Sequence, residues 1–165
     1  MKWTTSLAIA GFLAAGCAHA ADPKAAKVEC PAQPKDLVVR DATVGIGKTV
    51  GERNAVIVNY TGWLYDPAAP DCRGKQFDTS IGKPTPFSFM VSAGRVIKGW
   101  DEGLIGMKEG GDRVLIIPAD KAYGDKGAGG VIPPNATLTF EIHLIQILFQ
   151  PGVAAPPGPP KEIGK

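Results

Sequence analysis

The chain has 165 residues, which suits one domain of ordinary size and leaves little room for a second. Hydrophobic residues make up 44% of it and charged residues 21%, proportions that are ordinary for a globular protein. The formal net charge is only +2, and no cluster of Lys and Arg is interleaved with aromatic residues. These values argue against a nucleic acid or an anionic membrane surface as the partner.

The first twenty residues differ in kind from the rest of the chain. Lys2 precedes an apolar run from Leu7 to Ala15, and Ala18-His19-Ala20 follows, which is the layout of a secretory signal with a small-residue cleavage site. The run is far shorter than the ~20 apolar residues of a membrane-spanning helix. We therefore expect residues 1–20 to be a signal peptide and the protein to be exported, with the periplasm as the expected compartment. Lipoprotein-type cleavage before Cys17 is the alternative, and it would leave a lipid anchor at that residue.

Cys30 and Cys72 are the two thiols that remain after either cleavage. An exported chain meets an oxidising compartment, so an even pair of cysteines is a candidate disulfide. The bridge would stabilise the fold by roughly 4 kcal/mol in the chain-entropy account. Two unrelated free thiols are the alternative, whereas a separation of 42 residues argues against a metal site or a redox pair.

Composition divides the rest of the chain into three parts. Residues 21–36 are rich in Ala, Lys and Pro and read as an N-terminal arm without a core of its own. Residues 37–149 carry the periodic apolar patterns of a folded domain. Residues 150–165 are rich in Pro and Gly, which predicts a disordered tail.

Alternation of apolar and polar residues predicts strands within the folded domain. The longest stretches are NAVIVNYTGWLY (54–65) and TLTFEIHLIQILF (137–149), and shorter ones are PFSFMV (86–91) and RVLIIP (113–118). Only the segment around Trp100 reads as a helix. Its Gly99 lowers helix propensity by about 1 kcal/mol relative to alanine, which indicates close approach of the core or of a ligand. The pattern predicts an α+β fold in which an antiparallel sheet wraps around one short helix.

Two interpretations of the aromatic residues remain open at this point. The rings on the predicted strands can surround Trp100 and fill the core, or they can border an open hollow with Trp100 as its floor. His143 alternates with Thr139 and Glu141 and is expected on a solvated strand face. The run KEGGDR (108–113) is expected to form a solvated turn.

An ordered set of motifs from about Gly51 to Leu148 resembles the FKBP family of peptidyl-prolyl cis-trans isomerases, the macrolide-binding immunophilins. The motifs are VNYTGWLY, KQFDTS, VIKGW, AYG and VIPPNATL. The resemblance implies a five- to six-stranded antiparallel half-barrel around one short helix, with a shallow apolar pocket between them. It also implies proline-containing polypeptides as substrates and macrolides as inhibitors, and we expect a monomer.

The resemblance carries a set of pocket residues onto this sequence: Tyr60, Phe77, Asp78, Phe87, Val96, Ile97, Trp100, Tyr123, Ile132 and Phe140. It implies that the Ile97 backbone N–H and the Tyr123 hydroxyl donate hydrogen bonds to the prolyl carbonyls. KQFDTS is taken as a turn whose Asp78 orients Tyr60 or a nearby arginine; capping of the Thr79-Ser80 backbone is the alternative.

Rotation about an Xaa-Pro bond breaks no covalent bond, so this chemistry requires no nucleophile, metal ion or cofactor. The sequence also departs from the family pattern. An insert, DPAAPDCRG (66–74), brings in Cys72 and is expected to pin the arm near one edge of the pocket. Arg95 stands where an acidic residue is common, and the loop before VIPP is small. A non-catalytic chaperone or peptide-binding module that uses the same hollow is the alternative function.

Overall fold

The computed structural model describes residues 30–32 and 34–149, and the predicted signal peptide and C-terminal tail lie outside them. The element order is β1 (Val38–Thr43), β2 (Ala55–Tyr65), the 3-10 turn η2 (Pro70–Cys72), β3 (Arg73–Thr79), β4 (Phe87–Met90), α1 (Lys98–Gly103), β5 (Asp112–Ile117), the 3-10 turn η3 (Ala119–Lys121) and β6 (Leu138–Phe149). In this part of the chain no helix has the length and apolar character needed to traverse a lipid bilayer.

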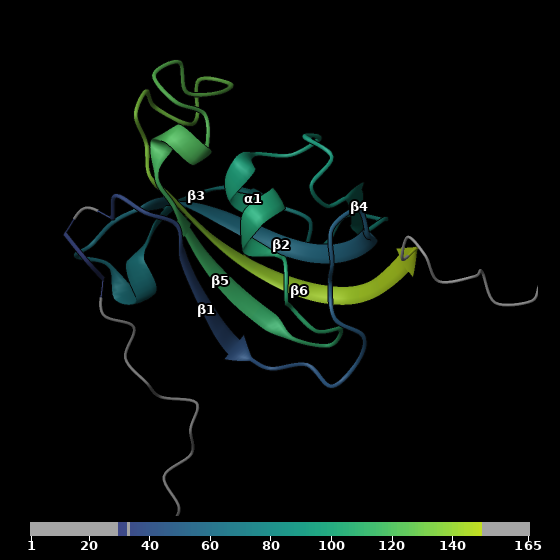
Figure 1. The fold of residues 1–165 in the computed structure, drawn as a ribbon. Helices are drawn as coiled ribbons and strands as arrows, with labels where there is room; N and C mark the ends of the chain where they lie inside the picture. Colours follow the sequence, from purple (N-terminus) through teal and green to yellow (C-terminus); the bar gives the residue numbers. More distant parts are fainter. Residues whose placement is uncertain (1–29, 33, 150–165) are drawn as a thin grey trace, which may run out of the picture.

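The six strands form one antiparallel sheet with the order β1-β5-β6-β2-β3, and β4 pairs with the first half of β2. The helix α1 lies against one face of this sheet, as Figure 1 shows. The predicted α+β class, with five to six antiparallel strands around one short helix, is confirmed. Two strands, β1 and β3, were not predicted, and residues 75–79 of the segment KQFDTS belong to β3 and do not form a turn.

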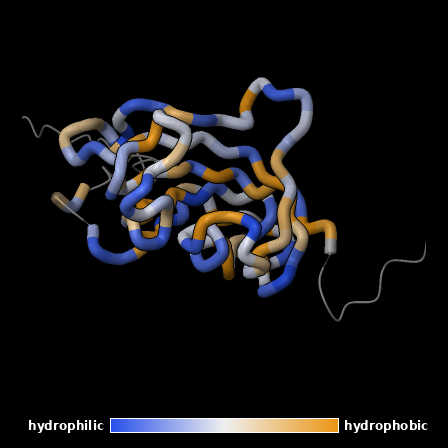
Figure 2. Tube along the Cα trace, turned by 90° about the horizontal axis from the view of Figure 1, so that it is seen from above, coloured by the Kyte–Doolittle hydropathy of each residue, from blue (hydrophilic) through white to orange (hydrophobic). Residues whose placement is uncertain are grey.

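The core lies between the sheet and α1 and follows from the period-two alternation of the two longest strands. Along β2, Val56 and Val58 are fully buried, and along β6, Ile142 and Leu144 are fully buried. Buried hydrophobic residues therefore recur at every second position in these parts of β2 and β6. Figure 2 shows hydrophobic and hydrophilic stretches following one another along the chain.

The helix comes close to β5 because its two buried glycines have no side chains. A Cβ atom added to Gly99 would lie 2.4 Å from the Ile117 side chain, and one added to Gly103 would lie 2.8 Å from Leu115. The group that approaches Gly99 closely is therefore a core side chain, Ile117, and not a ligand. Trp100 follows directly and is held at the inner surface of the sheet.

Arg113 fixes the other end of the helix, and the prediction of a solvated turn over 108–113 is wrong at this residue. Its side chain is buried and makes two hydrogen bonds to the Asp41 carboxylate, at 2.6 and 3.1 Å. It also donates to the carbonyl oxygens of Gly103 and Ile105, at 2.8 and 3.0 Å. One guanidinium group thus joins β1, β5 and the end of α1.

Candidate active site

A pocket of about 180 Å³ opens between α1 and the strands beside it. Its lining residues come from β2, β3, β4, the segment between β4 and α1, α1 itself, the loop after η3 and β6. They are Tyr60, Phe77, Asp78, Phe87, Arg95, Val96, Ile97, Trp100, Tyr123 and Phe140. The structure thus brings together nearly all of the residues that the sequence singled out. The predicted residue Ile132 does not line the pocket. It is 6% exposed and belongs to the hydrophobic core.

Trp100 combines the two roles that the sequence left open. Its side chain is 4% exposed and packs in the core, and it also lines the pocket. Three rings stand nearly perpendicular to the indole: Tyr60, Phe87 and Phe140 have interplanar angles of 80°, 76° and 87° and centroid distances of 5.1, 6.0 and 5.2 Å. Edge-to-face contacts of this kind are the favoured geometry for aromatic pairs. The side walls of the pocket are therefore aromatic.

Gly62 makes this ring arrangement possible and was not among the predicted site residues. A Cβ atom at Gly62 would lie 2.7 Å from the Phe140 ring and 2.8 Å from the Phe77 ring. These two rings meet edge to face, with centroids 5.6 Å apart. The glycine of the YTG motif is thus needed for space. Its position on the inner face of a strand, between Tyr60 and Leu64, is the signal that could have found it.

A hydrogen-bonded group at one side of the pocket orients Tyr60. Its hydroxyl donates to Asp78 Oδ2 at 2.5 Å, and Asp78 Oδ1 accepts from the Thr79 backbone N–H at 2.8 Å and from Lys83 Nζ at 3.0 Å. Orientation of Tyr60 and capping of the backbone at Thr79 therefore occur together, whereas the Ser80 N–H donates to the Tyr60 carbonyl oxygen at 2.9 Å and not to Asp78. The cation beside Asp78 is Lys83 rather than an arginine.

The pKa values in this group follow from burial and from these hydrogen bonds. Burial, and then the hydrogen bond to Asp78, raises the pKa of the Tyr60 hydroxyl well above its ordinary value. Burial by itself would raise the pKa of the Asp78 carboxyl, but the hydrogen bonds from Tyr60, Lys83 and Thr79 outweigh it and lower that pKa. Tyr60 is therefore protonated at neutral pH and cannot accept a proton as a phenolate. Asp78 is ionised, but its lowered pKa makes it a weak base.

Two hydrogen-bond donors in the pocket have no acceptor among the described residues. The Ile97 backbone N–H precedes the first turn of α1, where helical N–H groups lack intrahelical partners. The Tyr123 hydroxyl, on a side chain that is 40% exposed, also makes no hydrogen bond within the described part of the chain. Burial, and then the charge of Asp78, raises the pKa of this hydroxyl, so it keeps its proton at neutral pH.

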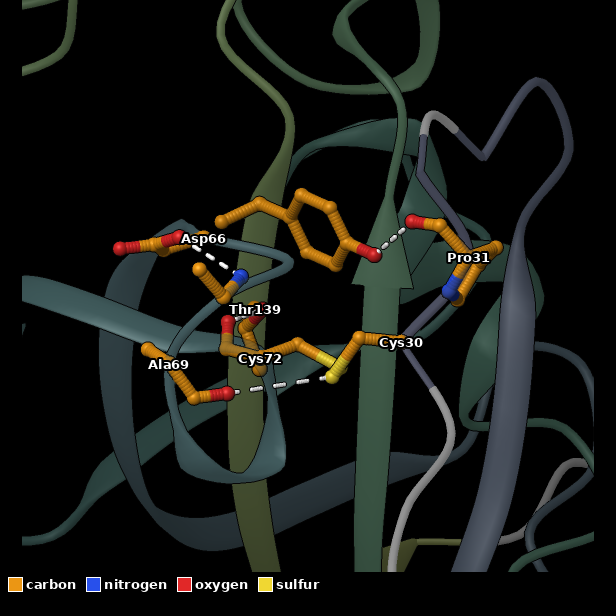
Figure 3. Close-up of a disulfide and its surroundings, with 8 residues drawn as sticks. Cys30, Pro31, Asp66, Ala69, Cys72 and Thr139 are labelled. Carbon is orange, nitrogen blue, oxygen red and sulfur yellow. Dashed lines mark hydrogen bonds between the residues drawn. A yellow bond between two sulfur atoms is a disulfide. The ribbon is translucent and has the colours of Figure 1, made fainter.

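The insert and the described arm residues 30–32 lie on the other face of the sheet. Cys30 and Cys72 are joined by a disulfide with a Cα–Cα distance of 5.6 Å, and the Tyr65 hydroxyl donates to the Pro31 carbonyl oxygen (Figure 3). Thr139, which donates to the Cys72 carbonyl at 2.9 Å, alternates along β6 with the pocket residue Phe140. The expectation that the bridge lies near an edge of the pocket is therefore wrong.

His143 occupies the same outer face, as predicted for a residue without a catalytic role. Its Nδ1 lies 2.7 Å from Asp112 Oδ1, and its side chain is 44% exposed. The neighbouring β6 residue on this face, Glu141, pairs with Arg73 at 3.1 Å. These two polar pairs lie on the side of the sheet away from the pocket.

Comparison with known sequences agrees with this geometry. The sequence profile described as FKBP-type peptidyl-prolyl cis-trans isomerase matches residues 47–145. A protein named FK506-binding protein from Neisseria meningitidis serogroup A is 46% identical over 111 residues, which are 67% of this chain and 95% of that protein. A protein of the same name from Streptomyces anulatus is 44% identical over 115 residues, which are 69% of this chain and 88% of that protein.

Solved structures show the same fold. The crystal structure of AtFKBP13 is similar with a TM-score of 0.60 and 36% identity, over 70% of this chain and 95% of that one. The crystal structure of FkpA from Escherichia coli is similar with a TM-score of 0.58 and 40% identity, over 67% of this chain and 47% of that one. The second protein is thus about twice as long as the region that the two share.

Proposed function

Since the chain belongs to the FKBP-type peptidyl-prolyl cis-trans isomerase family, we propose that its aromatic pocket accelerates rotation about Xaa-Pro bonds, with Trp100 as the floor under the proline ring. The observation that carries the proposal is the arrangement of three rings nearly perpendicular to the indole of Trp100 around a pocket of about 180 Å³. The volume and the aromatic walls suit a small apolar ring such as the pyrrolidine of proline.

The mechanism we propose rests on the difference in polarity between the planar and the twisted amide. Amide resonance sets a barrier of ~18–20 kcal/mol. When the bond twists it loses double-bond character, and negative charge leaves the carbonyl oxygen. The twisted amide therefore tolerates loss of water better than the planar one. A pocket walled by rings accelerates rotation if it binds the twisted form more tightly than the planar form.

Two donors support this proposal by their position and by their lack of partners. The Ile97 N–H and the Tyr123 hydroxyl both lie at the pocket and have no acceptor among the described residues. We propose that they bind the backbone carbonyls on either side of the prolyl bond and hold the substrate while the bond rotates. The Tyr60 hydroxyl, which is bound to Asp78, serves to fix the wall of the pocket.

The test is a protease-free isomerisation assay on Xaa-Pro peptides with the purified mature protein. We expect the wild-type protein to accelerate the cis-trans exchange and Trp100→Leu to lose most of this activity. Trp63→Leu is the matched control, because the ring of this tryptophan packs against Arg73, with its centroid 4.8 Å from the guanidinium carbon, and does not line the pocket. No acceleration by the folded wild-type protein would refute the proposed catalysis.

The alternative use of the pocket is binding without catalysis. A chaperone assay that measures suppression of aggregation of an unfolded protein distinguishes the two. If Trp100→Leu abolishes this suppression while the wild-type protein never accelerates isomerisation, the binding module is the correct function. Because relatives carry the name FK506-binding protein, we also propose that a macrolide competes with peptide for the pocket. We further propose a monomer, which light scattering checks.

We further propose that residues 1–20 are a secretory signal and that the mature chain acts outside the cytoplasm, in the periplasm of a bacterial host. The Cys30–Cys72 disulfide supports this, because such bonds persist in oxidising compartments. Intact mass of the protein from its host tests both points: it separates cleavage after Ala20 from lipidation at Cys17. A mass equal to that of the free dithiol would refute the bridge.

A further inference from the structure

Arg95 is a charged residue of the pocket that lacks a counter-charge. The other charged lining residue, Asp78, already receives hydrogen bonds from Tyr60, Thr79 and Lys83. Arg95 is exposed and makes no ion pair or hydrogen bond with any of the described residues. The uncompensated charge at the pocket is therefore a single guanidinium group.

The backbone that carries Arg95 is fixed on both sides. The Asp101 carboxylate accepts hydrogen bonds from the backbone N–H groups of Ser92 and Gly94, at 2.8 and 3.0 Å. Two residues after Arg95, the Ile97 carbonyl accepts the first bonds of α1. Only the side chain of Arg95 is free to adapt, and the same short segment carries the free Ile97 N–H. A charged substrate side chain near the proline would thus interact with a guanidinium group whose backbone is held in place.

We propose that Arg95 determines substrate specificity by favouring polypeptides with a carboxylate side chain next to the proline. This inference rests on the proposed function. Guanidinium and carboxylate groups form charge-assisted hydrogen bonds, often in pairs. A lysine side chain at the same substrate position meets a like charge and is disfavoured. Because Arg95 is exposed, the effect is modest: exposed ion pairs correspond to about a two- to fivefold change in affinity.

The experiment compares kcat/KM for peptides that differ in one residue beside the proline. One series places Glu, Gln or Lys immediately before the proline, and a second series places them immediately after it. In at least one series we expect the wild-type order Glu above Gln above Lys, with a Glu-to-Gln ratio of about two to five at low ionic strength. Salt of about 0.5 M should reduce this ratio, because it screens exposed charges.

Variants assign the preference to this side chain. Arg95→Gln should bring the Glu-to-Gln ratio to about one, and Arg95→Glu should reverse the order of Glu and Lys. Lys98→Gln is the matched control, since it removes an exposed cation three residues away that does not line the pocket. It should leave the ratio unchanged. Ratios are compared within each variant, so a general change in activity cancels.

The outcomes separate this inference from the function on which it rests. A wild-type ratio of one in both series, with the Gln peptides still accelerated, overturns the role of Arg95 and leaves the isomerase function in place. A ratio that survives Arg95→Gln, or that Lys98→Gln lowers as much, overturns it as well. If the wild-type protein accelerates no peptide, the function and the inference fall together.

Discussion

Replacing Gly99 with alanine should destabilise the protein, although alanine is the better helix former. The added Cβ would lie 2.4, 2.8 and 2.9 Å from Cγ2, Cδ1 and Cγ1 of Ile117. Ordinary contacts between such carbons are about 3.5–4.0 Å. Ile117 is fully buried on β5, and its contacting atoms include Cγ1 and Cγ2 at its branch point. The side chain therefore has no room to turn away, and α1 has to move off the sheet.

The expected size of the effect is a difference between two terms. Overpacking of a closed core costs typically 1–3 kcal/mol. Three contacts that are all shorter than ordinary ones, the shortest of them by about 1 Å or more, belong at the upper end, about 3 kcal/mol. The higher helix propensity of alanine returns about 1 kcal/mol. The free energy of unfolding should therefore fall by about 2 kcal/mol. For a domain of this size, that loss corresponds to a drop of about 8 °C in Tm.

A double-mutant cycle measured by urea unfolding tests the cause. Ile117→Ala removes all three contacting carbons and costs about 2–5 kcal/mol by itself. The double variant Gly99→Ala, Ile117→Ala should cost at least about 1 kcal/mol less than the sum of the two single variants, because the clash is gone. An additive cycle, or a single Gly99→Ala variant as stable as the wild-type protein, would refute the reasoning.

Three further predictions concern groups outside this contact. Arg113→Met should lower the free energy of unfolding by about 3 kcal/mol in urea, because Asp41 and two carbonyls lose their donor; Arg113→Lys should restore only part of the loss. Replacing Cys30 and Cys72 by serine should cost roughly 4 kcal/mol, and an unchanged Tm would contradict a stabilising bridge. Since the folded pKa of Asp78 is lowered, its contribution is present above its unfolded pKa of about 3.9 and is lost as the pH falls through the folded pKa. Asp78→Asn should therefore flatten the fall of Tm below about pH 4.

The parts of the fold that could be predicted are those with a local signal. Alternation over 54–65 and 137–149 indicated the two central strands, and the structure has β2 at Ala55–Tyr65 and β6 at Leu138–Phe149. Each of these strands packs one face against the core, so buried and less buried residues alternate along its sequence. The opposite face of β6 carries Thr139, Glu141 and His143, which alternation also indicated.

The missed strands lie at the two edges of the sheet, where this signal is weak. All residues of β1 (Val38–Thr43) are exposed or half-buried, and its partner strand β5 is about seventy residues away. Pairing over such a distance is decided by tertiary structure and leaves no local pattern. The same holds for Arg113: its neighbours in the sequence predict a polar turn, whereas its ion-pair partner, Asp41, lies on the distant strand β1.

The candidate site was predictable as a set of motifs but not as a shape. The motifs indicated the residues that line the pocket, because the family that they resemble has a known arrangement of these residues. They could not separate Ile132, which packs in the core, from Val96 and Ile97, which line the pocket. Nor could the motifs show that Gly62 makes room for the rings of Phe77 and Phe140, since this depends on how β3 and β6 pair with β2.

The central claim is that the prolyl bond rotates in the pocket over Trp100. The most direct measurement is NMR exchange spectroscopy of an Xaa-Pro peptide in the presence of the ¹⁵N-labelled mature protein. The Trp100 indole nitrogen is buried and has no acceptor among the described residues, so its resonance reports on the pocket. We predict faster cis-trans exchange together with a saturable shift of this resonance, while that of Trp63 stays in place. Faster exchange with an unchanged Trp100 resonance would contradict the claim.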